Sequence, residues 1–156
     1  MTGFTMRLDL DDLNDYVGAL EEQVEAAARP VAQAGAEILY RAVMRNVNAL
    51  GKVTGNFAAS IYQAYAKQES GPGHAVYDIS WNHRKAPHGH LIEDGFIQKF
   101  KVYLGKDGKW YTNKKAPLPA PVQRAAKAPV RRAASAIPEA EAAMEAKFYE
   151  LVGGGA

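Results

Sequence analysis

Apolar residues recur at every third or fourth position along a stretch near the N-terminus, and this spacing constrains the fold more than any other feature. The residues are Leu10, Leu13, Val17, Leu20, Val24, Ala27, Val31, Ala34 and Ile38. Such spacing gives a helix one apolar face. Pro30 removes one backbone donor, so we expect one kinked helix, or two in succession, running to about Leu50. A coiled coil is the alternative, but the small residues late in the stripe favour packing on a sheet.

Two hairpins are predicted downstream of this helix. Residues 57–65 can open as a helical turn and continue as a strand, and alternating apolar residues at 75–81 predict its partner. Residues 88–95 suit a single helical turn. Alternation returns at 96–104, and the pair Asp107-Gly108 predicts a tight turn before Trp110 begins the return strand.

The last third of the chain combines a proline-rich stretch with a second amphipathic helix. Residues 114–129 read KKAPLPAPVQRAAKAP, and we expect the prolines to exclude regular structure and favour an extended arm. Pro138 suits the first turn of a C-terminal helix that ends before Gly153.

These elements together predict an α+β fold in a single domain over residues 1–156. A long kinked N-terminal helix and a C-terminal helix are expected to pack on a small antiparallel sheet, with residues 97–132 as an extended basic hairpin and proline-rich arm. The helical residues expected in the core are Leu13, Val17, Leu20, Val24, Ile38, Leu39, Val43, Phe148 and Leu151.

Charge is polarised along a chain whose formal net charge is only +2. Residues 1–25 contain seven acidic residues against Arg7, whereas residues 97–132 contain ten basic residues against Asp107. This distribution suits head-to-tail contact between copies of the chain, or an acidic partner such as nucleic acid. Two solvated faces of unlike sign are the alternative that needs no partner.

The residues give little support for catalysis. The chain has no cysteine, which excludes thiolate nucleophiles and sulfur-ligated metals. His88, His90 and Glu93 could ligate zinc, but imidazoles two residues apart do not share one helical face. No Gly-x-Ser-x-Gly motif and no phosphate-binding loop occurs in the sequence. We therefore expect no enzymatic activity, cofactor, metal or small-molecule substrate, and a structural role for Glu93 beside an arginine.

The basic segment permits two interpretations. Its lysines are interleaved with Phe100, Tyr103, Trp110 and Tyr111, a combination that can neutralise phosphates and stack on bases. The same alternation in a hairpin can also direct the aromatic side chains inward and the lysines outward without any ligand. No stretch approaches the roughly 18 apolar residues of a membrane span, so we expect no membrane partner.

Short motifs in a fixed order carry a family resemblance. Thr54-Gly55-Asn56-Phe57 leads to Ser60-Ile61, and after a strand pair Gly89-His90-Leu91-Ile92-Glu93-Asp94-Gly95 follows, before the proline-rich stretch and the last helix. This layout resembles the tail-component, or neck, family of long-tailed bacteriophages, whose members join the filled head to the tail.

The resemblance implies a non-enzymatic virion protein, assembled in the cytoplasm of the bacterial host. It implies a ring of roughly six or twelve copies in contact with head-connector and tail proteins and with the DNA in the channel. The alternative is a small nucleic-acid-binding protein that uses residues 97–132.

The resemblance and the charge pattern together suggest three groups of functional residues. The acidic side of the oligomer interface is expected at Asp11, Asp12, Asp15 and Glu22. The basic arm that faces a partner or DNA is expected at Lys99, Lys101, Lys109, Lys114, Lys115, Arg124, Lys127, Arg131 and Arg132. The structural turns are expected at Gly55, Asn56, His90, Glu93 and Gly95.

Overall fold

A single long helix is the central element of the computed structural model, which describes residues 3–9, 21–51 and 55–153. Helix α2 (Glu21–Ala49) runs unbroken through Pro30. Of the two predicted arrangements, one helix and two in succession, the structure therefore has the first. Its buried side chains include Val24, Val31 and Val43, with several alanines beside them. This buried surface is broader than one stripe because α2 packs against other elements on two sides.

A three-stranded antiparallel sheet packs on one side of α2. The strands β1 (Phe4–Asp9), β3 (His74–Trp81) and β2 (Ile61–Tyr65) lie in the order β1-β3-β2. The pairing of β2 with β3 confirms the first predicted hairpin. Strand β1 was missed, although Phe4, Met6 and Leu8 alternate with polar residues and so carry a period-two pattern.

The remaining elements connect the sheet to the C-terminal helix. Short helix α3 (Asn56–Ser60) leads into β2, and α4 (Gly89–Asp94) follows β3. Strands β4 (Phe96–Leu104) and β5 (Trp110–Arg124) form the second predicted hairpin. The 3-10 helix η1 (Arg131–Ala136) continues directly into α5 (Ile137–Val152), which confirms the predicted C-terminal helix and the α+β fold class.

The expectation that the prolines exclude regular structure is wrong as far as Arg124. Strand β5 includes Pro117, which pairs with Phe100, and register shifts flank this pair. A proline can occupy a strand where no ladder hydrogen bond needs its missing N–H, as at an outer edge or a bulge. Because β5 has both an outer edge and bulges, it accommodates several prolines.

The predicted core residues are mostly buried. Val24, Leu39 and Val43 are fully enclosed, whereas Ile38 and Phe148 are half-buried. The prediction for Leu151 is wrong, since it is 42% exposed in the last turn of α5, whereas the buried Ala140 lies in the first turn of this helix. Three predicted core residues lie outside the described part of the chain: Leu13, Val17 and Leu20.

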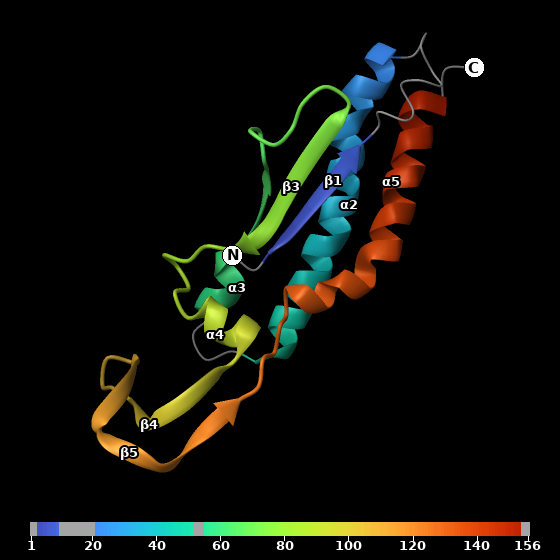
Figure 1. The fold of residues 1–156 in the computed structure, drawn as a ribbon. Coiled ribbons are helices and arrows are strands. Elements are labelled where there is room, and N and C mark those ends of the chain that lie inside the picture. The colour runs from blue at the N-terminus through green and yellow to red at the C-terminus, as the bar shows by residue number, and fades with distance from the viewer. Residues whose placement is uncertain (1–2, 10–20, 52–54, 154–156) are drawn as a thin grey trace.

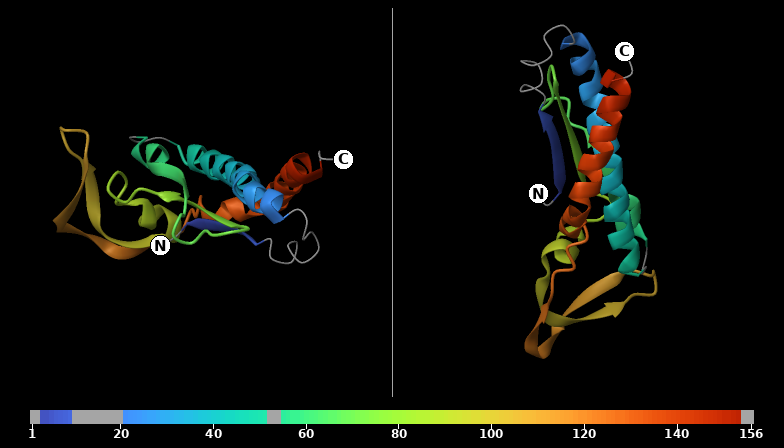
Figure 2. Two further views of the ribbon diagram at one scale, coloured as in Figure 1. Left: turned by 90° about the horizontal axis from the view of Figure 1, so that it is seen from above. Right: turned by 90° about the vertical axis from the view of Figure 1, so that its right-hand side faces the viewer.

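The body has two layers, and the second hairpin projects from one end of it. Helix α2 packs on the three-stranded sheet, and α5 lies beside α2 (Figures 1 and 2). The extensive contacts of α5 are with α2 and η1. Strands β4 and β5 extend beyond the body at the end opposite the C-terminus (Figure 1). We call this two-stranded hairpin, residues 96–124, the ribbon.

Candidate functional site

A buried carboxylate fastens the polypeptide at the base of the ribbon. The side chain of Glu93, at the end of α4, is fully buried and accepts hydrogen bonds from the backbone N–H groups of Val130 and Arg131, at 3.1 and 2.8 Å. The guanidinium of Arg131 lies 3.3 Å from the Glu93 carboxylate and 2.9 Å from that of Asp94. We call these contacts the Glu93 clasp. They join the chain just before the ribbon to the chain just after it.

Backbone contacts complete this base. The carbonyl of Ile92 accepts hydrogen bonds from the N–H groups of Lys127, at 2.9 Å, and Ala128, at 3.3 Å. Gly95 has a φ of 75°, and a Cβ atom there would lie 2.5 Å from the Arg124 carbonyl oxygen. Both strands of the ribbon are therefore held closely at their root, and only glycine fits at the turn into β4.

The outer part of the ribbon has two different faces. Adjacent residues of a strand point to opposite faces, and directly paired residues share one. Tyr103 pairs with Tyr111 on one face, and the two rings stack at 5.8 Å. The opposite face carries Val102, Leu104 and Trp110, which are 49%, 55% and 55% exposed. Aromatic side chains thus lie exposed on both faces, and the inward-facing alternative does not describe this ribbon.

A hydrogen bond closes the tip. The Tyr111 hydroxyl donates to the Asp107 carboxylate at 2.6 Å, and the Lys109 N–H donates to the same carboxylate at 3.2 Å. The hydrogen bond from Tyr111, followed by that from Lys109, lowers the pKa of Asp107. The same contact with Asp107 raises the pKa of Tyr111. The tip is therefore arranged for a charged carboxylate beside a neutral phenol.

Most of the predicted basic arm lies on the ribbon. Arg131 differs from the rest, because its side chain belongs to the Glu93 clasp within its own chain. The other predicted basic residues are exposed, and in the described ranges none of them forms an ion pair: Lys99, Lys101, Lys109, Lys114, Lys115, Arg124, Lys127 and Arg132. The ribbon thus presents unpaired positive charge beside exposed apolar side chains.

Little of the predicted acidic side can be located. Glu22 is exposed in the first turn of α2. Asp11, Asp12 and Asp15 lie outside the described residues.

The predicted turn residues occupy separate places. Gly55 has a φ of 75° and precedes α3, which begins at the exposed Asn56. The exposed His90 ring has its Nδ1 atom 2.8 Å from the carbonyl oxygen of Pro87. Of these residues, Glu93 and Gly95 are brought together, at the base of the ribbon.

Within the described ranges, no three His, Asp or Glu side chains gather closely enough to hold a metal ion. No helix in that part of the chain has the length and apolar character to span a bilayer.

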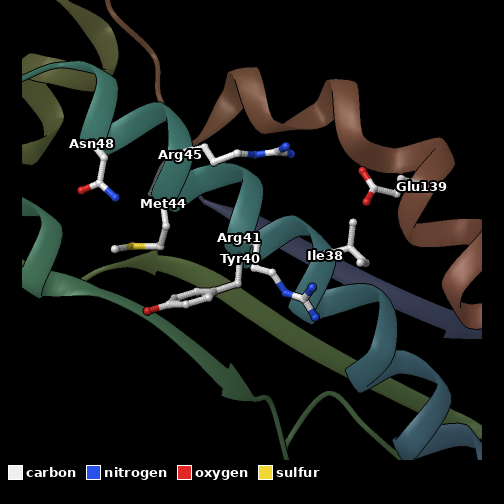
Figure 3. A pocket seen from close by; sticks show the side chains of 7 residues that line it. All are labelled: Ile38, Tyr40, Arg41, Met44, Arg45, Asn48 and Glu139. Carbon is white, nitrogen blue, oxygen red and sulfur yellow. The ribbon is translucent and has the colours of Figure 1, made fainter.

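A groove with a volume of about 430 Å³ lies along α2 near α5. Figure 3 shows Arg45 of α2 and Glu139 of α5 extending toward the space between the helices. The other residues that line it are Ile38, Tyr40, Arg41, Met44 and Asn48. Arg41 also forms an exposed ion pair with Glu37, at 3.7 Å. Both apolar and charged side chains line the groove, and these residues include no pair of a nucleophile and a base.

Sequence reasoning missed the apolar face of the ribbon. The alternation that predicts a strand also predicts two faces, but it does not say whether another element covers either of them. In the described structure neither ribbon strand makes extensive contact with the body. Exposure of Val102, Leu104 and Trp110 is therefore a property of the tertiary structure.

Comparison with known proteins identifies a family. A family model described as "Bacteriophage HK97-gp10, putative tail-component" matches residues 11–95, more than half of the chain. The match ends at Gly95, where the ribbon begins. No curated protein and no solved structure matches the chain.

Proposed function

The chain belongs to the bacteriophage HK97-gp10 tail-component family, and from that premise we propose that it is a neck subunit that completes the tail and joins it to the DNA-filled head. We propose that copies of the chain form a closed ring, of roughly six or twelve subunits, between head-connector and tail proteins. The role is structural and needs no catalysis, cofactor, small-molecule substrate or membrane. The subunit assembles in the cytoplasm of the bacterial host and remains in the virion.

The observation that carries this proposal is the projecting ribbon, whose base is held by the Glu93 clasp. A ring of identical subunits requires two different surfaces that complement each other. The ribbon offers one such surface, with unpaired lysines and exposed apolar side chains. The Glu93 clasp fixes where the ribbon leaves the body, so every copy can present it in the same orientation.

Electrostatics supports the choice of partners. We propose that Asp11, Asp12, Asp15 and Glu22 contribute to the acidic side of the contact between subunits. The basic residues of the ribbon, with Lys127 and Arg132, can contact an acidic neighbour or, without sequence preference, the phosphates of channel DNA. Arg131 is left out of this surface because it belongs to the Glu93 clasp.

A phage that lacks this gene provides the test. We expect electron microscopy of lysates to show DNA-filled heads and finished tails that remain separate, and the parent gene supplied in trans to restore joined particles. Joined, infectious particles that lack the protein would contradict the proposal. Light scattering on the purified protein then tests whether it forms a ring.

A small nucleic-acid-binding protein is the second candidate function, because lysines and exposed aromatic rings share the ribbon. This candidate predicts tight duplex binding by the isolated protein that weakens steeply with salt. It also predicts normal joining of heads and tails when the gene is absent.

A further inference from the structure

We propose that the ribbon of one copy docks on the outward face of α5 of the next copy. This inference rests on the proposed ring and names the surfaces that form it. The outward face of α5 is defined by Glu141, Ala142, Glu145, Ala146 and Tyr149, all of which are exposed.

The ribbon needs a covering surface. A two-stranded sheet that packs on nothing else is marginally stable in water. On one face of the outer part of the ribbon, the side chains of Val102, Leu104 and Trp110 are each about half exposed. A contiguous exposed apolar patch of this kind marks an interaction site. Lys114 belongs to the same face as Trp110, and Lys106 lies in the turn next to Leu104, so a partner that covers this face is expected to be acidic.

The outward face of α5 has the complementary chemistry. Glu141, Glu145 and Tyr149 follow one another at four-residue spacing, so they form a line along the helix. Tyr149 is 62% exposed. The small side chains of Ala142 and Ala146 lie next to that line and permit close approach of a flat ribbon. The face therefore combines small apolar side chains at its centre with carboxylates beside them.

The acidic character extends to the sides of the helix. Glu139 and Glu150 are also exposed on α5, and its single basic residue, Lys147, lies 2.8 Å from the carboxylate of Glu150. In the described ranges Glu141 and Glu145 form no ion pair. These two carboxylates are therefore available to the lysines of another chain.

The positions of the two surfaces favour contact between neighbouring copies over contact within one chain. The ribbon projects from one end of the molecule, whereas α5 runs along the body toward the other end (Figures 1 and 2). Neither ribbon strand makes extensive contact with α5 of its own chain among the described residues. Two unlike surfaces at different ends of one subunit give a head-to-tail contact, which closes into a ring when the rotation permits.

Duplex DNA fits the same ribbon less well. Phosphates would neutralise the lysines, but they would leave Val102, Leu104 and Trp110 exposed to water. A protein face covers both kinds of side chain at once. We therefore assign the ribbon to the next subunit.

Charge reversal on each surface tests the docking. The ribbon variant carries Lys106→Glu in the tip turn and Lys114→Glu on the face of Trp110, and the helix variant carries Glu141→Lys and Glu145→Lys. In each variant like charges face each other, so we expect light scattering at low salt to show self-association weakened about tenfold or more. Mixing the two variants, or combining all four changes in one chain, makes the surfaces complementary again. Both are expected to restore the mass of the parent assembly.

Two further variants make the result specific. Lys67→Glu with Lys85→Glu changes the same charge at exposed lysines elsewhere, and it should leave the assembly intact. Parent mass in both reversed variants would overturn the docking while leaving the ring proposal standing. Dispersal by Asp11→Lys, Asp12→Lys and Asp15→Lys, with no effect of the helix variant, would move the acidic side to the N-terminal segment. Loss of duplex binding in the ribbon variant, with assembly unchanged, would assign the ribbon to DNA.

If the purified parent protein is monomeric in solution, cross-linking in assembled particles tests the docking. The chain has no cysteine, so a variant with Val102→Cys and Ala142→Cys reports only this contact. We expect oxidation of particles that contain the variant to give a ladder of covalent multimers, and either cysteine alone to give none. Particles that contain the protein but give no ladder would overturn the docking. Joined particles without the protein would instead overturn the proposed function.

Discussion

Glu93 shows how one residue can connect distant parts of the sequence. A carboxylate removed from water is costly unless it is paired and hydrogen-bonded. Here two backbone N–H groups and the guanidinium of Arg131 satisfy it, all supplied by residues beyond the ribbon. The role of Glu93 is therefore to close the base of the ribbon.

Replacing this carboxylate tests that role. Glu93→Gln keeps the shape but removes the charge from a fully buried site, so we expect a loss of roughly 2–4 kcal/mol in the free energy of unfolding. Asp94→Asn is the matched control, because Asp94 is half-exposed and its contact with Arg131 is worth less than about 1 kcal/mol. Urea denaturation of both variants gives the comparison. Equal losses would contradict the special role of Glu93.

Gly95 allows a second test at the same base. Gly95→Ala and Gly55→Ala both place alanine at a φ of 75°, which costs about 1 kcal/mol in each case. Only at Gly95 does the added Cβ atom meet backbone, that of Arg124 and Ala126. Overpacking there should add about 1–3 kcal/mol. Thermal unfolding of the two variants measures the difference, and identical melting temperatures would show that the root of the ribbon is not tightly held.

At the scale of elements, the ribbon and the body are built differently. The body strands β1, β2 and β3 form one sheet that packs on α2. The ribbon has two strands only, with prolines and register shifts along β5. Bulges and prolines discourage another strand from adding to an edge. The ribbon is thus better suited to docking by a face than by edge-to-edge pairing.

The ribbon tip should respond to pH at both ends of the scale. The contact with Tyr111 lowers the pKa of Asp107 below its ordinary value of 3.8, so this contribution is present above that pH and is lost as the pH falls through the lowered value. The same contact raises the pKa of Tyr111 above 10.0, so its contribution is present below pH 10 and is lost as the pH rises through the raised value.

Fluorescence of Trp110 provides a readout close to this contact. A variant with Trp81→Phe leaves Trp110 as the only tryptophan, and we expect its emission to change at both acidic and alkaline pH while the far-ultraviolet circular dichroism is retained. Adding Tyr111→Phe removes the hydrogen bond, so it should abolish the alkaline change and move the acidic change to higher pH, because only backbone N–H groups then lower the pKa of Asp107. An alkaline change that persists in that variant would belong to another group.

Helix α2 organises the body of the molecule. It contacts both the sheet and α5, and small residues such as Ala32 and Ala36 are fully buried where these elements pack. We propose that residues 1–156 form one folding unit, because one continuous set of buried side chains joins α2, β3, η1 and α5.

A charge in this shared core should affect every layer together. Leu39 is 4% exposed, so Leu39→Asp should lower the free energy of unfolding by about 3 kcal/mol or more. Ala26→Asp places the same charge on the exposed side of α2 and should cost far less. Calorimetry should show one cooperative transition, lowered in the Leu39 variant. An unchanged melting temperature would mean that the core face of α2 is misassigned.

Local patterns in the sequence determined the elements of the fold. Spacing by three and four residues predicted the apolar face of α2, alternation predicted strands β3 and β4, and an Asp-Gly pair marked the ribbon turn. The family also followed from short motifs, in the part of the chain that the family model matches. These features depend on residues that are close together in the chain, so a sequence contains them directly.

Contacts between elements depend on how the whole chain packs, and the structure was needed to find them. Glu93 and Arg131 lie 38 residues apart in the sequence but meet in the structure. Gly89 lies against the indole of Trp81, which leaves no room for a side chain at this position. The apolar face of the ribbon is also uncovered in the described structure. The sequence does not reveal this, because side chains alternate with a period of two in buried and exposed strands alike. Pairing between distant residues depends on how the layers pack, and local spacing does not encode that packing.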